Sequence, residues 1–193
     1  MDYTKTKVLD YYLKRTLKPK RYIHSLGVED MAGELAEIHG ADIKKARFAG
    51  LVHDIAKCHS CEAMNRLIRT YGVDLKFLNT PELAHSKVGA AMLKQDFGIE
   101  DIDILMAVSS HTAGRYGMSL LEEIVYVADA IELNRTYAEA PYLRLLAKQD
   151  LDKACLEIID YSIDLLGARS VPVDNDTHEA KRFILDKITE RKS

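Results

Sequence analysis

The segment AGLVHDIAK, residues 49–57, places a histidine and an aspartate side by side in an otherwise apolar stretch. The pattern predicts a helix that begins at Asp42, a favourable N-cap residue, and carries His53 and Asp54 near its end. Adjacent helix residues point about 100° apart, so the two polar side chains cannot both lie at the centre of one buried stripe unless something polar lies between them. A metal ion would be such a partner.

The preceding helix also directs a polar residue inward. It is expected over residues 19–40, because it begins with a proline, which a first helical turn tolerates, and ends at a glycine. His24 shares one stripe of this helix with Val28, Met31 and Leu35. His24 is therefore expected to face the core.

A third helix carries a carboxylate in an apolar environment. The segment IVYVADAIEL, residues 124–133, belongs to a predicted helix over residues 120–134 and includes Asp129. A buried carboxylate without a partner is costly. Asp129 therefore requires a cation, a hydrogen-bond network or exposure.

The remaining chain repeats apolar residues at three- and four-residue spacing, which predicts an all-α fold, a helical bundle with the metal site between its helices. Further helices are expected around residues 61–70, 82–97, 100–110, 142–166 with a possible break, and 175–191. With 193 residues and no evident linker, the chain is expected to form a single domain over residues 1–193, with a C-terminal helical extension.

Composition narrows the class of protein. The net charge of -3 argues against long nucleic acids as partners. No apolar run approaches the ~20 residues that span a bilayer, and the charged amino terminus does not suit a signal peptide, so a cytoplasmic protein is expected. Cys58 and Cys61 form a lone CxxC motif, but a redox role needs a βαβ context and a zinc ribbon needs a second ligand pair, and neither is visible.

The candidate metal ligands are His24, His53, Asp54 and Asp129. Two imidazoles and two carboxylates suit Fe, Mn, Zn, Co or Ni. Water and substrate oxygens would complete the coordination, so that the metal could lower the pKa of the water and polarise a phosphoryl group. This chemistry hydrolyses phosphate esters and anhydrides.

Other polar residues are candidates for binding phosphate or protonating a leaving group. His85 and His111 lie at predicted helix ends, away from an obvious core role. The cations Arg21, Lys57, Arg115 and Arg135 have surface charge as their alternative interpretation. The other histidines lie in predicted helix ends and loops, where exposure to solvent explains a polar residue, and they are assigned no role. They are His39, His59 and His178.

Several segments together resemble one branch of the HD-domain phosphohydrolase superfamily. The segments RYIHSLGV, AGLVHDIAK, LAHSKVGA, SSHTAGR, YVADAIELNR and GARSVPVDNDTHEA are similar to those of the YqeK-type symmetrical diadenosine tetraphosphate hydrolases. The resemblance implies an all-helical HD fold, an iron centre and hydrolysis of diadenosine tetraphosphate at its midpoint to two ADP.

The resemblance also implies roles for individual residues. It puts the metal on the same four ligands. The leading hypothesis makes Asp54, His85 and His111 catalytic, with His85 or His111 and the arginines neutralising charge on the departing ADP. The residues implied to bind the nucleotide are Arg21, Lys57, His85, His111, Arg115, Arg135, Ser170, Val171 and Pro172.

Alternatives to this interpretation remain open. Another HD-type hydrolase, acting on a mononucleotide, a deoxynucleoside triphosphate or a cyclic nucleotide, would share every ligand, and a non-catalytic nucleotide- or metal-binding module would lack turnover. One metal is favoured, with His85 and His111 left to the substrate, although a second ion that shares Asp54 is the alternative. Tyrosines at positions 3, 11 and 12 would allow a homodimer.

Overall fold

The computed structural model describes residues 3–191, and within that range the chain forms helices and no strand. The predicted all-α fold is thus confirmed. In chain order the elements are α1 (Tyr3–Thr16), α2 (Pro19–His39), α3 (Ile43–Val52), α4 (Cys61–Tyr71), the 3-10 helix η1 (Leu75–Phe77), α5 (Pro81–Gln95), α6 (Ile102–Ser110), α7 (Leu120–Ile131), α8 (Ala140–Gln149), α9 (Leu151–Ala168) and α10 (Asn175–Glu190). Among the described residues, no helix is both long enough and apolar enough to cross a membrane.

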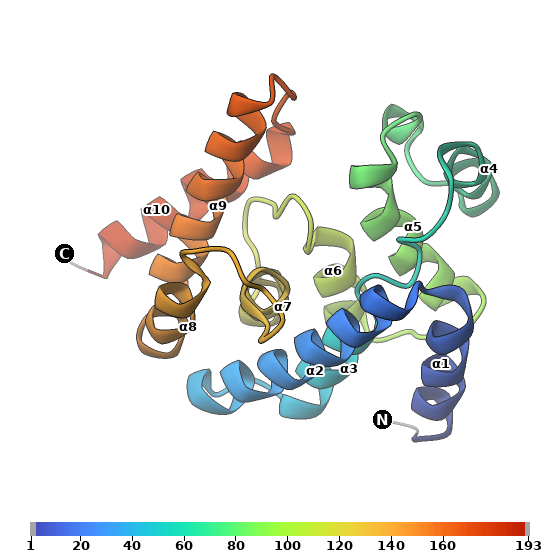
Figure 1. Cartoon of the computed structure of the whole chain (residues 1–193), viewed down its shortest axis with the longest axis horizontal. Coiled ribbons are helices and arrows are strands. Elements are labelled where there is room, and N and C mark those ends of the chain that lie inside the picture. The colour runs from blue at the N-terminus through green and yellow to red at the C-terminus, as the bar shows by residue number, and fades with distance from the viewer. Residues whose placement is uncertain (1–2, 192–193) are drawn as a thin grey trace.

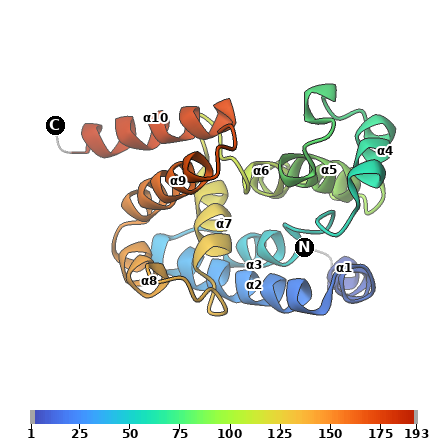
Figure 2. The same cartoon turned by 45° about the horizontal axis from the view of Figure 1, so that its top comes forward.

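Helix α7 occupies the middle of the molecule. Figure 1 and Figure 2 show α8, α9 and α10 on one side of it and α1, α4 and α5 on the other. Helices α2, α3, α6 and α9 all contact α7. Its residues Ile124, Val125, Val127 and Ala128 are fully buried, so the apolar segment noted in the sequence forms the centre of the core.

Helices α2 and α3 pack backbone against backbone. A methyl group built on Gly50 of α3 would lie 2.8 Å from the carbonyl oxygen of Val28 and 3.0 Å from Cα of Glu29, both in α2. Because glycine has no side chain, the two helices can approach this closely. The approach brings the helix that bears His24 next to the end of α3.

The His53-Asp54 pair lies beyond α3, which corrects the prediction that the helix carries it. Helix α3 ends at Val52 and His53 is its C-cap. The amide of Ile55 then donates to the carbonyl of Val52 at 3.0 Å, and the chain continues in tight turns. Because these residues leave the α-helical path, adjacent side chains can both be buried, with 0% and 2% exposure for His53 and Asp54.

Two other boundaries differ little from expectation. Helix α5 ends at Gln95, two residues before the predicted end. The possible break within residues 142–166 falls at Asp150, which separates α8 from α9 and accepts a hydrogen bond from the amide of Lys153. A carboxylate that caps a new helix explains the break.

The amino-terminal tyrosines differ in exposure. Tyr11 is 62% exposed, whereas Tyr12 is half-buried and packs edge-on against Phe97 with ring centroids 5.2 Å apart. The side chain of Tyr3 lies outside the described residues. The homodimer therefore stays a prediction.

A group of charges, in which the two carboxylates are buried, joins α7, α9 and α10. Lys187 Nζ lies 2.6 Å from Glu123 Oε1 and 2.8 Å from Asp152 Oδ1, and Arg191 forms a second ion pair with Asp152. Burial, together with the charge of Asp152, raises the pKa of Glu123 to about 8 even though Lys187 opposes the shift. These ion pairs connect α10 to α7 and α9. The assignment of the chain to a single domain with a C-terminal extension stays a prediction.

This group of charges should make stability depend on pH. Between the ordinary glutamate pKa of 4.5 and the folded value of about 8, the unfolded chain loses a proton that folded Glu123 retains, so raising the pH favours unfolding. From pH 5.5 to pH 8, we expect the free energy of unfolding of Glu123→Gln to fall by about 1–3 kcal/mol less than that of the wild type. Urea denaturation at both pH values measures this. Glu157→Gln, an exposed substitution on α9, is the control, and an unchanged pH dependence in Glu123→Gln would contradict the prediction.

Candidate metal centre

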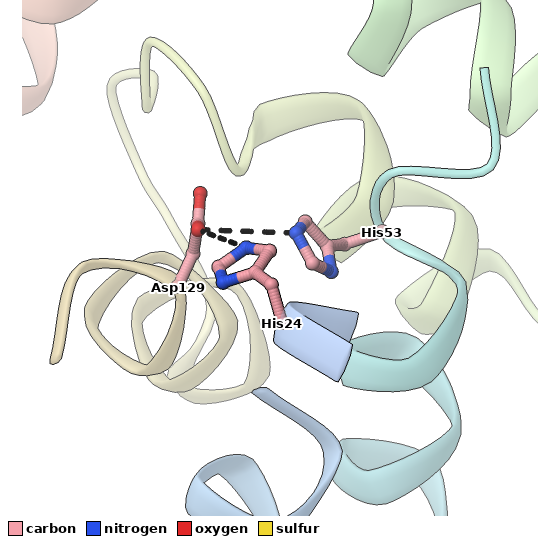
Figure 3. Close-up of side chains that lie close together, drawn as sticks. All are labelled: His24, His53 and Asp129. Atoms are coloured by element: carbon pink, nitrogen blue, oxygen red, sulfur yellow. Dashed lines mark ion pairs between the residues drawn. The ribbon is translucent and has the colours of Figure 1, made fainter. Parts of the chain in front are cut away.

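The four predicted metal ligands meet between α2, the end of α3 and α7. Figure 3 shows three of them, His24 from α2, His53 from the turn after α3, and Asp129 from α7. His24 Nε2 lies 2.9 Å from Asp129 Oδ1, and His53 Nε2 lies 3.8 Å from the same oxygen. Asp54 Oδ2 lies 3.3 Å from His53 Nε2 and 3.9 Å from His24 Nε2. Four potential donor atoms therefore face one another.

The hydrogen bonds of the two imidazoles leave lone pairs on their Nε2 atoms. His53 Nδ1 lies 2.7 Å from the carbonyl oxygen of Gly50, and His24 Nδ1 lies 3.1 Å from Glu132 Oε1. A carbonyl and a carboxylate only accept, so each Nδ1 carries the ring proton. Both Nε2 atoms are buried and lack a hydrogen-bond partner. Two buried lone pairs directed at carboxylate oxygens fit a metal ion.

Both carboxylates of the cluster favour the ionised form. Burial alone would raise the pKa of Asp54, but His53, His111 and His85 outweigh it and hold that pKa well below the usual range. Burial likewise opposes ionisation of Asp129, and the neighbouring imidazoles of His24 and His53 hold its pKa well below the usual range. Anionic oxygens beside imidazole nitrogens are the donors that divalent transition metals prefer.

A second pair of imidazoles faces the other oxygen of Asp54. His85 Nε2 and His111 Nε2 lie 3.2 Å and 3.6 Å from Asp54 Oδ1 and 3.1 Å from each other. Thr112 Oγ1 lies 3.2 Å and 3.1 Å from these two nitrogens, and Lys57 Nζ lies 3.3 Å from His85 Nε2. Both histidines are buried, although the sequence showed no obvious core role for them.

The cluster contains two groups of possible ligands. His24, His53 and Asp129 have ligand atoms within 4.8 Å of one another, and so do His53, Asp54 and His111. Burial lowers the pKa of His111 to about 4, so its ring is neutral at pH 7. Because the two groups share His53, the single metal favoured from the sequence stays a prediction.

Two arginines border the cluster. Arg21 Nη1 lies 2.8 Å from Asp54 Oδ2, and Arg135 Nη2 lies 2.7 Å from Asp129 Oδ1. The side chains of Arg21 and Arg135 are 31% and 36% exposed, whereas their partners Asp54 and Asp129 are 2% and 23% exposed, so each guanidinium lies on the solvent side of its carboxylate. Guanidinium groups in this position suit phosphate oxygens.

The other residues predicted to bind the substrate, Arg115, Ser170, Val171 and Pro172, lie outside the pocket beside the cluster. Arg115 Nε and Nη2 donate to the carboxylate of Glu122 at 2.6 Å and 2.7 Å. Ser170, Val171 and Pro172 are exposed beyond the end of α9. These four candidates are not among the residues that line the pocket beside the cluster, and their role stays a prediction.

The main pocket, a cavity of about 420 Å³, opens beside the cluster. Its lining includes Asp54, Asp129, the two arginines, Tyr137 and Tyr161. These two rings stack with centroids 5.3 Å apart and planes inclined by 23°. The volume lies in the range of about 300–1,000 Å³ typical of ligand sites. The lining of the pocket thus contains both cations that suit an anion and aromatic rings that suit a flat ring.

Sequence reasoning did not identify Glu132, which orients His24. Glu132 is 1% exposed, and its Oε2 accepts hydrogen bonds from the backbone and side-chain nitrogens of Asn134 at 2.6 Å and 2.9 Å. Gly27 leaves room for this carboxylate, because a methyl group there would collide with Oε2. The available signal was the position of Glu132 three residues after Asp129, near one helical turn. Carboxylates that orient metal-ligating histidines often matter nearly as much as the ligands.

Comparison with known families defines the class of protein. The HD-domain profile matches residues 21–134, more than half of the chain and the part that holds all four predicted ligands. The chain therefore belongs to the HD-domain family, whose members are metal-dependent phosphohydrolases.

Several proteins that are similar to this chain in sequence indicate a narrower class within this family. The chain is 42% identical to the symmetrical bis(5'-nucleosyl)-tetraphosphatase of Bacillus subtilis, over 86% of this chain and 89% of that protein. Proteins of the same name from Halalkalibacterium halodurans and Staphylococcus aureus are 39% and 36% identical, over 86% and 88% of this chain and 89% of each relative. The resemblance noted in the sequence is thereby confirmed.

A solved structure supports the fold. A protein from Clostridium acetobutylicum, described as a predicted HD superfamily hydrolase involved in NAD metabolism, is 38% identical and superposes with a TM-score of 0.90. The match covers 97% of this chain and 98% of that one. The similarity extends through the C-terminal helices, beyond the segment that the family profile matches.

Proposed function

We propose that the protein hydrolyses diadenosine tetraphosphate at its midpoint, with a bound divalent metal, and releases two molecules of ADP. The observation that carries this proposal is the group of unpartnered imidazole nitrogens and ionised carboxylates beside a cationic pocket. It occurs in a chain that is 36–42% identical to symmetrical bis(5'-nucleosyl)-tetraphosphatases.

His24, His53, Asp54 and Asp129 would hold the metal. Two imidazoles and two carboxylates fit iron, the ion that we propose, with Mn, Co, Ni and Zn as alternatives. When bound, the ion lowers the pKa of a water and polarises a phosphoryl oxygen. Elemental analysis of protein purified without added metal tests the assignment to iron.

The remaining side chains would bind and neutralise the polyphosphate. Arg21 and Arg135 lie where they can hold the oxygens of the two central phosphates, and Lys57 adds a charge beside His85. The oxygen of water forms a bond to one central phosphorus, and the bond from that phosphorus to the bridging oxygen breaks. The bridging oxygen leaves with the second ADP, and the protons of the water are released. His85 and the arginines would stabilise the charge on the departing ADP, and the neutral ring of His111 would hold His85 in place.

Nucleotide chromatography tests the proposal. We expect metal-loaded protein to convert diadenosine tetraphosphate to ADP alone and a chelator to stop the reaction. AMP plus ATP would mean asymmetric cleavage. Turnover of ATP, AMP or a cyclic nucleotide instead would point to another HD-type hydrolase, and no product from any of them would favour a binding module.

The proposed activity would operate in the cytoplasm, as the sequence predicts. Fractionation of cells, followed by assay of each fraction for diadenosine tetraphosphate hydrolysis, tests this location. Activity confined to a membrane fraction would contradict it.

A further inference from the structure

A second pocket lies against the same two arginines. This cavity of about 360 Å³ is lined by residues near the start of α2 and residues that follow α7, and Arg21 and Arg135 line both it and the main pocket. His24 lines the second pocket and Asp129 lines the main pocket, although their nearest atoms are only 2.9 Å apart. The candidate metal ligands therefore lie at the junction of two pockets.

The second pocket has an excess of positive charge. Lys20 is exposed in its lining, beside Arg21 and Arg135. The acidic lining residue, Glu132, is buried, and its two oxygens are engaged by His24 and Asn134. Three cations therefore line the pocket against one carboxylate, and this excess of positive charge attracts anions.

An apolar side chain is exposed in the same lining. Ile23 is 52% exposed, although it stands between cationic residues and His24 in the first turns of α2. A large aliphatic side chain in a cationic pocket offers a surface that a nucleobase can cover while the phosphates bind the arginines. The second pocket thus repeats, with different residues, the combination of an anion site and an apolar wall in the main pocket.

We infer that the second pocket binds the second nucleoside diphosphate half of the substrate, while the main pocket binds the first half. This inference rests on the proposed function. The substrate has two identical halves, and the chain offers two cavities of comparable volume, about 360 Å³ and 420 Å³. With one half in each, the central phosphates lie at the junction, beside Arg21, Arg135 and the metal ligands. Cleavage at the midpoint then follows from the position of the ligands between the pockets.

Binding of ADP tests the inference independently of turnover. By calorimetry, metal-loaded wild-type protein is expected to bind two ADP molecules per chain, whereas Ile23→Asp should retain one. Ile23 is exposed, so the substitution leaves the core intact. Ile38→Asp is the matched control, because Ile38 is a 45% exposed isoleucine of the same helix that lines neither pocket. One ADP per wild-type chain, or two in Ile23→Asp, would overturn the second subsite.

A truncated substrate gives the kinetic counterpart. Adenosine 5'-tetraphosphate has a single nucleoside, which the main pocket can hold alone. We expect Ile23→Ala, which removes the apolar surface without adding a charge, to lower kcat/KM for diadenosine tetraphosphate about 10-fold, chiefly through KM, and to change kcat/KM for adenosine 5'-tetraphosphate by less than about 2-fold. Equal effects on both substrates would refute the inference. Failure of the wild type to hydrolyse diadenosine tetraphosphate would instead refute the proposed function, and the ADP stoichiometry would still report on the pocket.

Discussion

Asp54→Asn is expected to lower the turnover of diadenosine tetraphosphate by about three orders of magnitude or more. Asp54 Oδ2 faces His53 and Arg21, and Oδ1 faces His85 and His111. Asparagine keeps the shape but removes the negative charge, and its amide nitrogen donates hydrogen bonds where the wild type only accepts. A weakened metal site and a disordered histidine pair should follow together.

The measurements are metal content, turnover and circular dichroism on the same preparation. Asp103→Asn is the control, because Asp103 is 55% exposed on α6 and pairs with Lys45 at 2.7 Å. The control should keep full activity and full metal, whereas Asp54→Asn should lose both and remain helical. Wild-type turnover in Asp54→Asn would remove Asp54 from the site.

Much of the fold could be predicted because its signals are local. Pro19 and Gly40 bound α2, and Asp42 caps α3 through the amides of Lys44 and Lys45, as short-range rules anticipate. The end of α3 could not be predicted in this way. Nothing local stops the apolar period before Ile55, and the turn that buries both His53 and Asp54 forms against helices from distant parts of the chain.

Some site residues could be predicted because their polarity conflicts with that of their neighbours in the sequence. His24 and Asp129 are examples, since each is a polar residue in an otherwise apolar stripe of its helix. By contrast, Glu132 binds a histidine 108 residues earlier, and its spacing from Asp129 does not identify that partner. The pairing of Arg115 with Glu122 also depends on the conformation of a loop. Gly114 and Gly117, both at φ 71°, turn the chain there so that Arg115 can contact Glu122.

Gly50→Ala is expected to destabilise the protein by about 1–3 kcal/mol, despite the gain of up to about 1 kcal/mol in helix propensity that alanine brings. The new methyl group would lie 2.8 Å from the carbonyl oxygen of Val28, and a backbone neighbour cannot rotate away. The helices must separate, which moves His53 at the end of α3 relative to His24 in α2. Metal affinity should therefore fall along with stability.

Gly167→Ala provides the matched control for this mechanism. Gly167 lies in α9 with a negative φ, and a methyl group there would meet no atom within 4 Å. The same chemical change should there stabilise the protein by about 0.5–1 kcal/mol and leave metal binding unaltered. Urea denaturation and metal titration of both variants measure the contrast. If Gly50→Ala were stabilised as Gly167→Ala is, the close approach of α2 and α3 would not position the metal ligands.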